Sequence, residues 1–292
     1  MTINRYKIFD AVFKSGSFTK AAGQLHLTQP GITNAINSLE TEWGFPLFIR
    51  SRTGLELTSE GKHMLKIVRE LLQSEERIIQ EVNNINGIET GTVKVGVFTS
   101  VASFWMPTII EIFQSRHPNI DIELSHGTYE QIKTRLLDGE LDCGFVKIPL
   151  SSKRVEVVPL INDRLKCIIS KQHRLAHKKI ISFEEIKDDP IILPPEGGDI
   201  DVKEIFDKYD TEPNIKFRLI DYNSIISFVA KNHGFSIIAD MVEIKNPNIH
   251  KLHFKENVQR HIGIACHPLK SPATEKFINC VQEWVENREQ DL

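Results

Sequence analysis

Amide and hydroxyl side chains recur at helical spacing between residues 29 and 37, and such groups can read the edges of DNA bases. Gln29, Thr33 and Asn37 are four residues apart, so on a helix they share one face, and Asn34 lies beside them. A side-chain amide can form two hydrogen bonds with adenine, and threonine can contact a thymine methyl group. Of these residues, Gln29 is our first choice for a direct contact with a base. For each residue taken alone, an ordinary solvated helix face is the alternative.

Basic residues on either side of this segment could bind the phosphate backbone. Lys20 precedes it, and Arg50 and Arg52 follow in a short turn. Cationic side chains beside a groove bind phosphates without sequence preference. The complete set of predicted DNA-contacting residues is Ser17, Lys20, Thr28, Gln29, Pro30, Thr33, Asn34, Asn37, Arg50, Arg52 and Thr53.

Three helices and a small hairpin are expected to position these side chains. A first helix should end at Gly16, Ser17 should cap a second, and Thr28 should cap a third that runs to about Glu42. Pro30 falls in the first turn of the third helix, where its missing N–H costs little. The face of this helix opposite Gln29 is apolar and should pack inward; it carries Ile32, Ala35, Ile36 and Leu39. The segments 47–49 and 55–57 should form the hairpin.

One long helix is predicted over residues 59–86, because this segment contains no proline and has its one glycine near the start. Its apolar residues alternate at spacings of four and three, which is typical of a helix that pairs with another helix. The residues expected to pair two subunits are Met64, Val68, Leu71, Ile78, Val82 and Ile85. The alternative is that this stripe packs on its own domain.

The residues beyond the long helix alternate strand and helix patterns, which predicts an α/β fold. The expected strands are 92–97, 120–124, 143–146, 155–160, 165–170, 217–220, 236–239 and 261–266. The expected helices are 105–115, 131–137 and 274–287.

The N-terminal motif closely resembles that of the LysR-type transcriptional regulators. The match consists of SFTKAAGQLHLTQPGIT at 17–33, LE at 39–40, GFPLFIR at 44–50 and TSEG at 58–61. More diffuse similarity follows in GT at 127–128, LDGELD at 137–142 and AKNHGF at 230–235. Many relatives carry arginine or lysine where this chain has Asn34 and Asn37. Phosphate binding should therefore rest more on Lys20, on the turn between the hairpin strands and on dimeric avidity.

The resemblance implies an N-terminal winged helix-turn-helix, all-α with a small β wing, followed by a long linker helix and a two-lobed α/β effector domain similar to type 2 periplasmic binding proteins. The expected boundaries are 1–58 for the DNA-binding domain, 59–88 for the linker, 92–162 with 267–292 for the first lobe, and 163–266 for the second. It also implies a homodimer or a dimer of dimers, a double-stranded DNA operator, a small-molecule effector between the lobes, and RNA polymerase as a partner.

Family position places Thr99, Ser100 and Thr128 in the effector site, where hydroxyl groups could bind a carboxylate. Residues that could complete this site are Lys147, Pro195, Gly198, Asn223 and Ser224. Taken singly, each is as well explained as a cap or a turn former. Sites of this type favour a small organic anion. No cofactor is expected.

Composition and charge agree with a DNA-binding N-terminus on a globular protein. The chain has 40% hydrophobic and 26% charged residues and a net charge of −3. Residues 1–58 are the exception, because they carry six Lys and Arg against four Asp and Glu. No apolar run is long enough to span a bilayer and no secretion signal is evident, so we expect a cytoplasmic protein with no membrane partner.

Three other functions agree less well with the sequence. An enzyme or metal site would need more than the histidine pairs His173 with His177 and His250 with His253, which lack a completing carboxylate and cysteine set. A thiol-based redox sensor of the same architecture would need a resolving pair among Cys143, Cys167, Cys266 and Cys280, whose spacing suggests none. A free-standing solute-binding protein conflicts with the helix-turn-helix. We therefore expect neither enzymatic activity nor a metal site.

Overall fold

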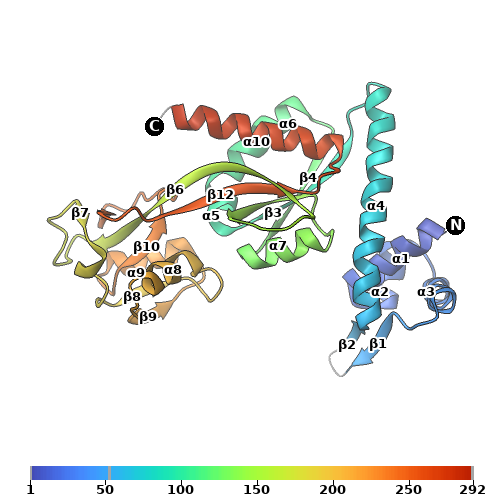
Figure 1. The fold of residues 1–292 in the computed structure, drawn as a ribbon, viewed down its shortest axis with the longest axis horizontal. Helices are drawn as coiled ribbons and strands as arrows, with labels where there is room; N and C mark the ends of the chain where they lie inside the picture. The colour runs from blue at the N-terminus through green and yellow to red at the C-terminus, as the bar shows by residue number, and fades with distance from the viewer. Residues whose placement is uncertain (1, 52–53, 291–292) are drawn as a thin grey trace.

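The computed structural model describes residues 2–51 and 54–290 and contains a small N-terminal domain, a long helix and a larger α/β domain (Figure 1). The N-terminal domain comprises α1 (Thr2–Ser15), α2 (Phe18–Gln24), α3 (Gln29–Trp43), β1 (Phe48–Ser51) and β2 (Gly54–Leu57). The two predicted caps are confirmed: Ser17 accepts a hydrogen bond from the Lys20 N–H, and Thr28 accepts one from the Gly31 N–H. The helix α3 ends at Gly44, in the left-handed conformation that favours glycine.

A buried apolar core fixes which face of α3 points outward. Ile32, Ile36 and Leu39 are buried together with Phe9 and Leu47. Burying these side chains stabilises the domain by roughly 1.5–3 kcal/mol each. The opposite face of α3 is therefore held away from its own domain.

The linker helix α4 (Ser59–Ile85) starts against the N-terminal domain and extends beyond it (Figure 1). Gly61 permits the close approach, since a Cβ there would lie 2.3 Å from the Leu47 carbonyl oxygen. Leu65 and Val68 are buried in the core of the N-terminal domain. The prediction that Val68 pairs two subunits is therefore wrong: the first half of the stripe packs on its own domain, the alternative considered above.

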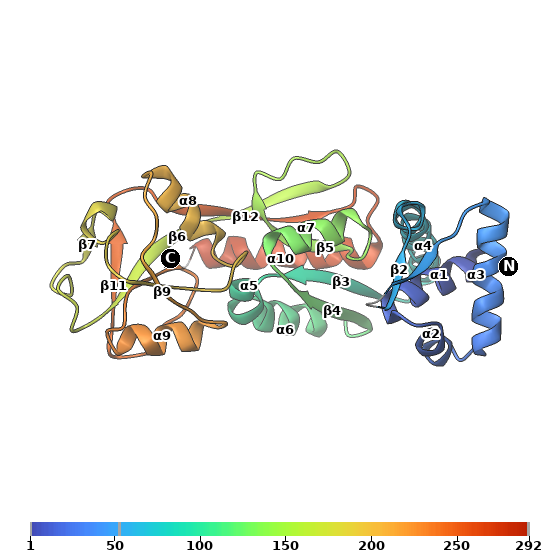
Figure 2. The ribbon, with the colours of Figure 1, turned by 90° about the horizontal axis from the view of Figure 1, so that it is seen from below.

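The first lobe of the C-terminal domain is built on β3 (Gly91–Val97), β4 (Ile120–His126) and β5 (Cys143–Ile148). β3 pairs in parallel with both of the others. Its helices are α5 (Thr99–Phe104), α6 (Met106–Arg116), α7 (Tyr129–Leu137) and α10 (Pro272–Gln290). The helices α7 and α10 lie on opposite faces of this sheet (Figures 1 and 2).

The second lobe contains β7 (Ile180–Ile181), η1 (Phe183–Glu185), β8 (Ile191–Leu193), α8 (Ile200–Lys208), β9 (Ile215–Arg218), α9 (Tyr222–Ala230), β10 (Ser236–Ala239) and β11 (Ile249–Phe254). Two strands connect the lobes, β6 (Glu156–Ser170) and β12 (Gln259–Cys266). The first half of β6 pairs with β12, and the second half pairs with β10 and β11. β6 thus carries one eight-stranded sheet from the first lobe into the second.

Several predicted boundaries need correction. The strands expected at 155–160 and 165–170 are one strand, because the polar residues between them stay in register with β12. The second lobe was expected to extend to residue 266, but β12 pairs with β5 and so belongs mainly to the first lobe. The helix expected at 105–115 is confirmed as α6, shifted by one residue, whereas α5 before it was not predicted. In the described ranges, no helix is both long enough and apolar enough to cross a membrane.

Candidate DNA-binding surface and effector cleft

The outward face of α3 carries the predicted amide and hydroxyl groups. Gln29, Asn34 and Asn37 are exposed, and Thr33 is half-buried beside them. The Gln29 Nε2 donates to Thr33 Oγ1 at 3.2 Å, and that hydroxyl donates to the Gln29 carbonyl oxygen at 3.1 Å. Both bonds are local, so the Gln29 amide can exchange its bond for one to a base edge.

A groove of about 570 Å³ runs between this face, the start of α2 and the hairpin. Glu40 lines it, but its carboxylate accepts the backbone N–H groups of Leu47 at 2.6 Å and Phe48 at 3.4 Å. Glu40 therefore ties the hairpin to α3. Lys20 is exposed at the start of α2. Of the predicted hairpin contacts, Arg52 and Thr53 lie outside the described residues, as does the side chain of Arg50.

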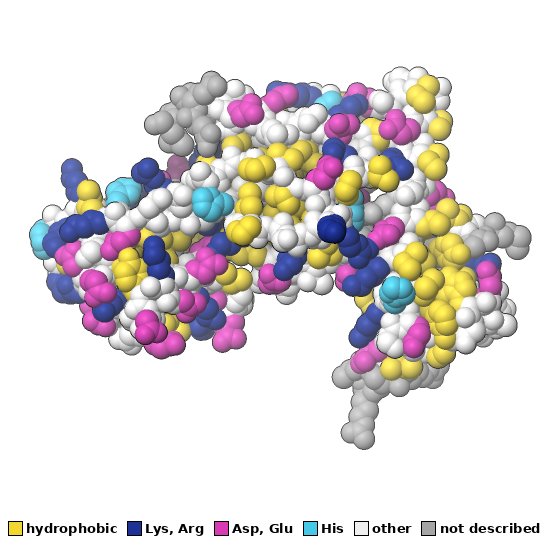
Figure 3. All heavy atoms as spheres, in the orientation of Figure 1, with side chains coloured by type: hydrophobic (Ala, Val, Ile, Leu, Met, Phe, Trp, Pro, Cys, Tyr) yellow, Lys and Arg dark blue, Asp and Glu magenta, His cyan; other side chains and the backbone are white. Residues whose placement is uncertain are grey.

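Apolar side chains remain exposed on the far half of α4. Ile78 is 62% exposed and Ile85 is 83% exposed. Leu71 and Val82 are also exposed, at 43% and 51%, whereas Val68 is buried. Figure 3 shows hydrophobic side chains along α4. The far half of the helix therefore offers an uncovered apolar face, whereas Met64 packs against the core of its own domain.

A cleft of about 100 Å³ lies between the two lobes. Four predicted effector residues line it: Thr99, Ser100, Thr128 and Gly198. Three others do not, and their placement in the cleft is wrong: Pro195, Asn223 and Ser224. Lys147 lies behind the wall of the cleft, where its Nζ donates to Asp201. Asp221 caps α9 by accepting from the backbone N–H and the hydroxyl of Ser224, and Pro195 and Asn223 are exposed.

The three predicted hydroxyl groups of the cleft already have partners. Thr99 Oγ1 lies 3.0 Å from His126 Nε2. Ser100 is buried and its hydroxyl accepts a hydrogen bond from Arg260 at 2.8 Å. Thr128 caps α7 by accepting from the Gln131 N–H. These side chains shape the walls of the cleft as well as offering groups to a ligand.

Arg260, on β12, is a buried cation that lines the cleft, and it was not predicted from the sequence. Its side chain is 4% exposed. Its Nε and Nη2 donate to Asp163 at 2.9 and 2.8 Å, and its Nη1 donates to the Tyr129 hydroxyl oxygen at 2.9 Å and to Asp201 at 3.3 Å. Burial raises the pKa of Tyr129 above its ordinary value, and the adjacent Asp201 adds to the shift although Arg260 opposes it. Tyr129 therefore stays a neutral donor.

No spacing rule could have found this network. Arg260 and Asp163 are direct partners across β12 and β6 although 97 residues separate them. Lys147 also belongs to it, since its Nζ donates to Asp201 at 2.8 Å and to Glu204 at 2.6 Å. Lys147 thus acts on the cleft through Asp201.

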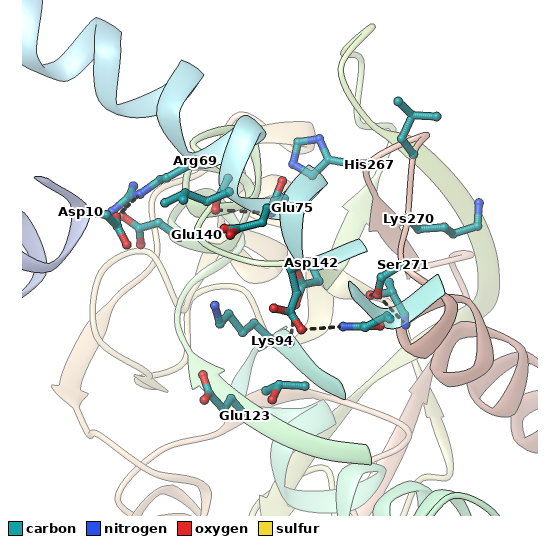
Figure 4. Close-up of a pocket in the computed structure, with 18 of the residues that line it drawn as sticks. Asp10, Arg69, Glu75, Lys94, Glu123, Glu140, Asp142, His267, Lys270 and Ser271 are labelled. Atoms are coloured by element: carbon teal, nitrogen blue, oxygen red, sulfur yellow. Dashed lines mark hydrogen bonds and ion pairs between the residues drawn. The ribbon is translucent and has the colours of Figure 1, made fainter. Parts of the chain in front are cut away.

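A second polar cavity, of about 320 Å³, lies where α1, α4 and the first lobe meet (Figure 4). Arg69 of α4 is buried there, and its Nε donates to Asp10 at 2.7 Å while its Nη1 donates to Glu140 at 2.9 Å. Its Nη2 has no hydrogen-bond partner among residues 2–51 and 54–290, and its guanidinium lies 5.2 Å from the centre of the Phe13 ring. Lys66 adds an ion pair with Asp138 at 2.7 Å. Charged contacts thus join the DNA-binding domain to the sensing domain.

Comparison with protein families matches both parts of the chain. Residues 3–62 match the bacterial regulatory helix-turn-helix protein, lysR family, and residues 86–286 match the LysR substrate binding domain. The chain belongs to the LysR family of transcriptional regulators. It is accordingly a DNA-binding regulator with an effector-binding C-terminal domain.

Individual relatives are similar to this chain over almost its whole length. The chain is 31% identical over 292 residues to the HTH-type transcriptional regulator YoaU of Bacillus subtilis, covering 98% of this chain and 99% of that protein. Full-length OxyR from Pseudomonas aeruginosa, a variant structure, is similar with a TM-score of 0.80 and 21% identity, covering 98% and 95%. CbnR complexed with its target DNA has a TM-score of 0.65 and 23% identity, covering 97% and 99%. The structural similarities establish the LysR-type fold.

The cysteines of this LysR-family chain are buried and free. Cys143 and Cys266 are register partners on β5 and β12, a neighbour that sequence spacing did not reveal. Burial raises the pKa of both thiols above the ordinary value. Both therefore stay protonated at neutral pH, and a thiol, unlike a thiolate, is a weak nucleophile.

The histidines that resembled metal-ligand pairs have other partners. His173 Nε2 lies 3.1 Å from Asp189, and His250 Nε2 lies 2.6 Å from the Lys178 carbonyl oxygen. Within the described part of the chain, no group of three or more His, Cys, Asp or Glu side chains could hold a metal ion.

Proposed function

We propose that two copies of this chain each insert α3 into a major groove of an operator, and that a small organic anion bound between the lobes controls this binding. The single observation that carries the proposal is the outward row of Gln29, Thr33, Asn34 and Asn37 on α3, which is backed by a buried apolar seam. The major groove admits one α-helix, and early residues of that helix reach the base edges.

Each part of the fold has its own role in this proposal. Residues 1–58 bind DNA, with Lys20 and the hairpin gripping phosphates, and 59–88 pair the subunits through the exposed residues Leu71, Ile78, Val82 and Ile85. The two lobes bind the effector at Thr99, Ser100, Thr128 and Gly198. The assembly is a homodimer or a dimer of dimers that acts in the cytoplasm, where it contacts RNA polymerase. CbnR, a structural neighbour, is described in a complex with its target DNA, which supports the DNA-binding mode.

Fluorescence anisotropy with a duplex from the chain's own upstream region tests the proposal. Gln29→Ala should weaken binding to the preferred operator by about 1–3 kcal/mol, about 5- to 150-fold, and hardly change binding to a scrambled duplex. Gln24→Ala, an exposed glutamine at the end of α2, is the matched control and should bind like the unsubstituted protein. If the protein bound no duplex in preference to a scrambled one, the proposal would be wrong.

A further inference from the structure

The carboxylate of Asp201 is held as a bound carboxylate ligand would be held. Its Oδ2 accepts hydrogen bonds from the Tyr129 hydroxyl at 2.8 Å and from Arg260 Nη1 at 3.3 Å, and its Oδ1 accepts from Lys147 Nζ at 2.8 Å. Two cations and one neutral hydroxyl thus converge on a single carboxylate. Charge-assisted hydrogen bonds of this kind are the strong ones in proteins.

The carboxylate and its donors come from different parts of the molecule. Asp201 lies in the first turn of α8, in the second lobe. Tyr129 starts α7 and Lys147 lies on β5, both in the first lobe, and Arg260 lies on the connecting strand β12. The contact therefore closes one lobe on the other, and it breaks when they separate.

If Asp201 left, the Tyr129 hydroxyl would lose its acceptor, Lys147 would keep only Glu204, and Arg260 Nη1 would keep only the Tyr129 hydroxyl. The side chain of Arg260 is 4% exposed and that of Lys147 is 18% exposed. Nε and Nη2 of Arg260 donate to Asp163, and Nη1 donates to Tyr129 and Asp201. Leaving a buried donor without an acceptor costs about 1–3 kcal/mol, so a free carboxylate has a strong reason to enter.

We propose that Asp201 is an internal ligand, which occupies a carboxylate subsite formed by Tyr129, Lys147 and Arg260 and keeps the lobes closed until the carboxylate of an effector takes its place. The inference rests on the proposed function and deepens it, because it specifies the effector as a carboxylate.

The walls of the cleft indicate what the carboxylate should be attached to. Asp201, Tyr129 and Arg260 line the cleft, and apolar groups of Phe98, Tyr222 and Ile225 line it as well. A tethered carboxylate competes at an effective concentration in the millimolar range, so a free one needs further contacts to displace it. The effector is therefore a carboxylate on a compact apolar body.

Isothermal titration calorimetry of the full chain with isobutyrate tests the proposal. Asp201→Ala removes the internal competitor, so isobutyrate should bind this variant at least about tenfold more tightly than it binds the unsubstituted protein. Asp207→Ala is the matched control, because Asp207 is an exposed aspartate on the same helix. It should bind isobutyrate like the unsubstituted protein.

Asp201→Asn is the second variant, in case Asp201→Ala fails to fold. It keeps the shape of the side chain and loses its charge, so it should also gain affinity for isobutyrate. Equal affinity in the unsubstituted protein and whichever Asp201 variant folds would overturn the proposal, as would an equal gain in Asp207→Ala. Calorimetry needs no DNA, so a failure to bind an operator would overturn the proposed function and leave this result standing.

Discussion

Arg69 and Arg260 are both buried at a joint between parts of the molecule, yet their hydrogen bonding differs. All three nitrogens of Arg260 have partners, and its Asp163 partner is 3% exposed. Arg69 has one nitrogen with no partner in the described residues, and of its partners Asp10 is buried whereas Glu140 is 23% exposed. The connection between the lobes is thus fully satisfied, whereas the joint between α4 and the first lobe is not.

This difference indicates two kinds of joint. A buried network with every donor matched favours one geometry, because any displacement leaves a group unpaired. A joint with an unmatched donor and a partly exposed partner loses less hydrogen-bond energy when it shifts. We therefore expect the cleft to switch between discrete states and the joint at Arg69 to adjust more freely.

Arg260→Ala should have the largest effect on stability. It leaves Asp163 buried without its cation, which costs about 3–5 kcal/mol. Differential scanning calorimetry should show this loss in the effector domain. Arg164→Ala, which removes the exposed neighbouring arginine on β6, should change stability by no more than about 0.5 kcal/mol. Similar losses of stability in both variants would contradict a specific role for the buried Arg260.

Arg69→Ala should cost less, about 2 kcal/mol, because Lys14 still pairs with Asp10 at 2.5 Å after the change. Hydrogen exchange should quicken in the segment 138–141, which Arg69 and Gln73 contact. Arg77→Ala, on the same helix, is the control and should leave that segment unchanged. A loss as large as that of Arg260→Ala would end the contrast between the joints.

The pH dependence of stability should reveal Asp10. Burial alone would raise the pKa of this carboxyl, but Lys14 and Arg69 together outweigh burial and lower it. A lowered pKa stabilises the fold above the unfolded value of about 4 and stops doing so as the pH falls through the folded value. Asp10→Asn should therefore cost about 1.5 kcal/mol at pH 7 and progressively less below about pH 4. A gap that stayed constant down to pH 2 would contradict this assignment.

The thiols should give the smallest effect. Because burial raises the pKa of Cys143 and Cys266, the native protein should react with a thiol reagent far more slowly than the urea-unfolded chain. Mild peroxide should leave operator affinity unchanged. Rapid native labelling at either residue would revive the redox-sensing alternative.

Local signals were enough to predict the N-terminal domain and the linker helix. The caps Ser17 and Thr28 and the apolar seam of α3 act over a few residues, so they can be read directly from the chain. The linker helix was predicted for the same reason. What the periodicity could not decide was which part of its stripe packs on its own domain, since Val68 and Val82 look alike in sequence and differ only in their surroundings.

Long-range pairing explains what was missed in the cleft. Asp163 lies between apolar stretches and resembles a turn residue, yet strand pairing sets it opposite Arg260. Asn223 and Ser224 were assigned to the effector, whereas Asp221 makes Ser224 part of a helix cap. Thr99, Ser100 and Thr128 were placed beside the cleft by family position, which captures the fold but not the charged network around Arg260.

Hydrogen–deuterium exchange of the full chain with and without its operator duplex tests the central claim most directly. The first turn of α3 has backbone N–H groups that lack helical acceptors, so bound DNA should slow exchange in residues 28–34. The account predicts this protection with the specific duplex and much less with a scrambled one. Protection confined to residues 92–290, with α3 exchanging as in the free protein, would contradict it.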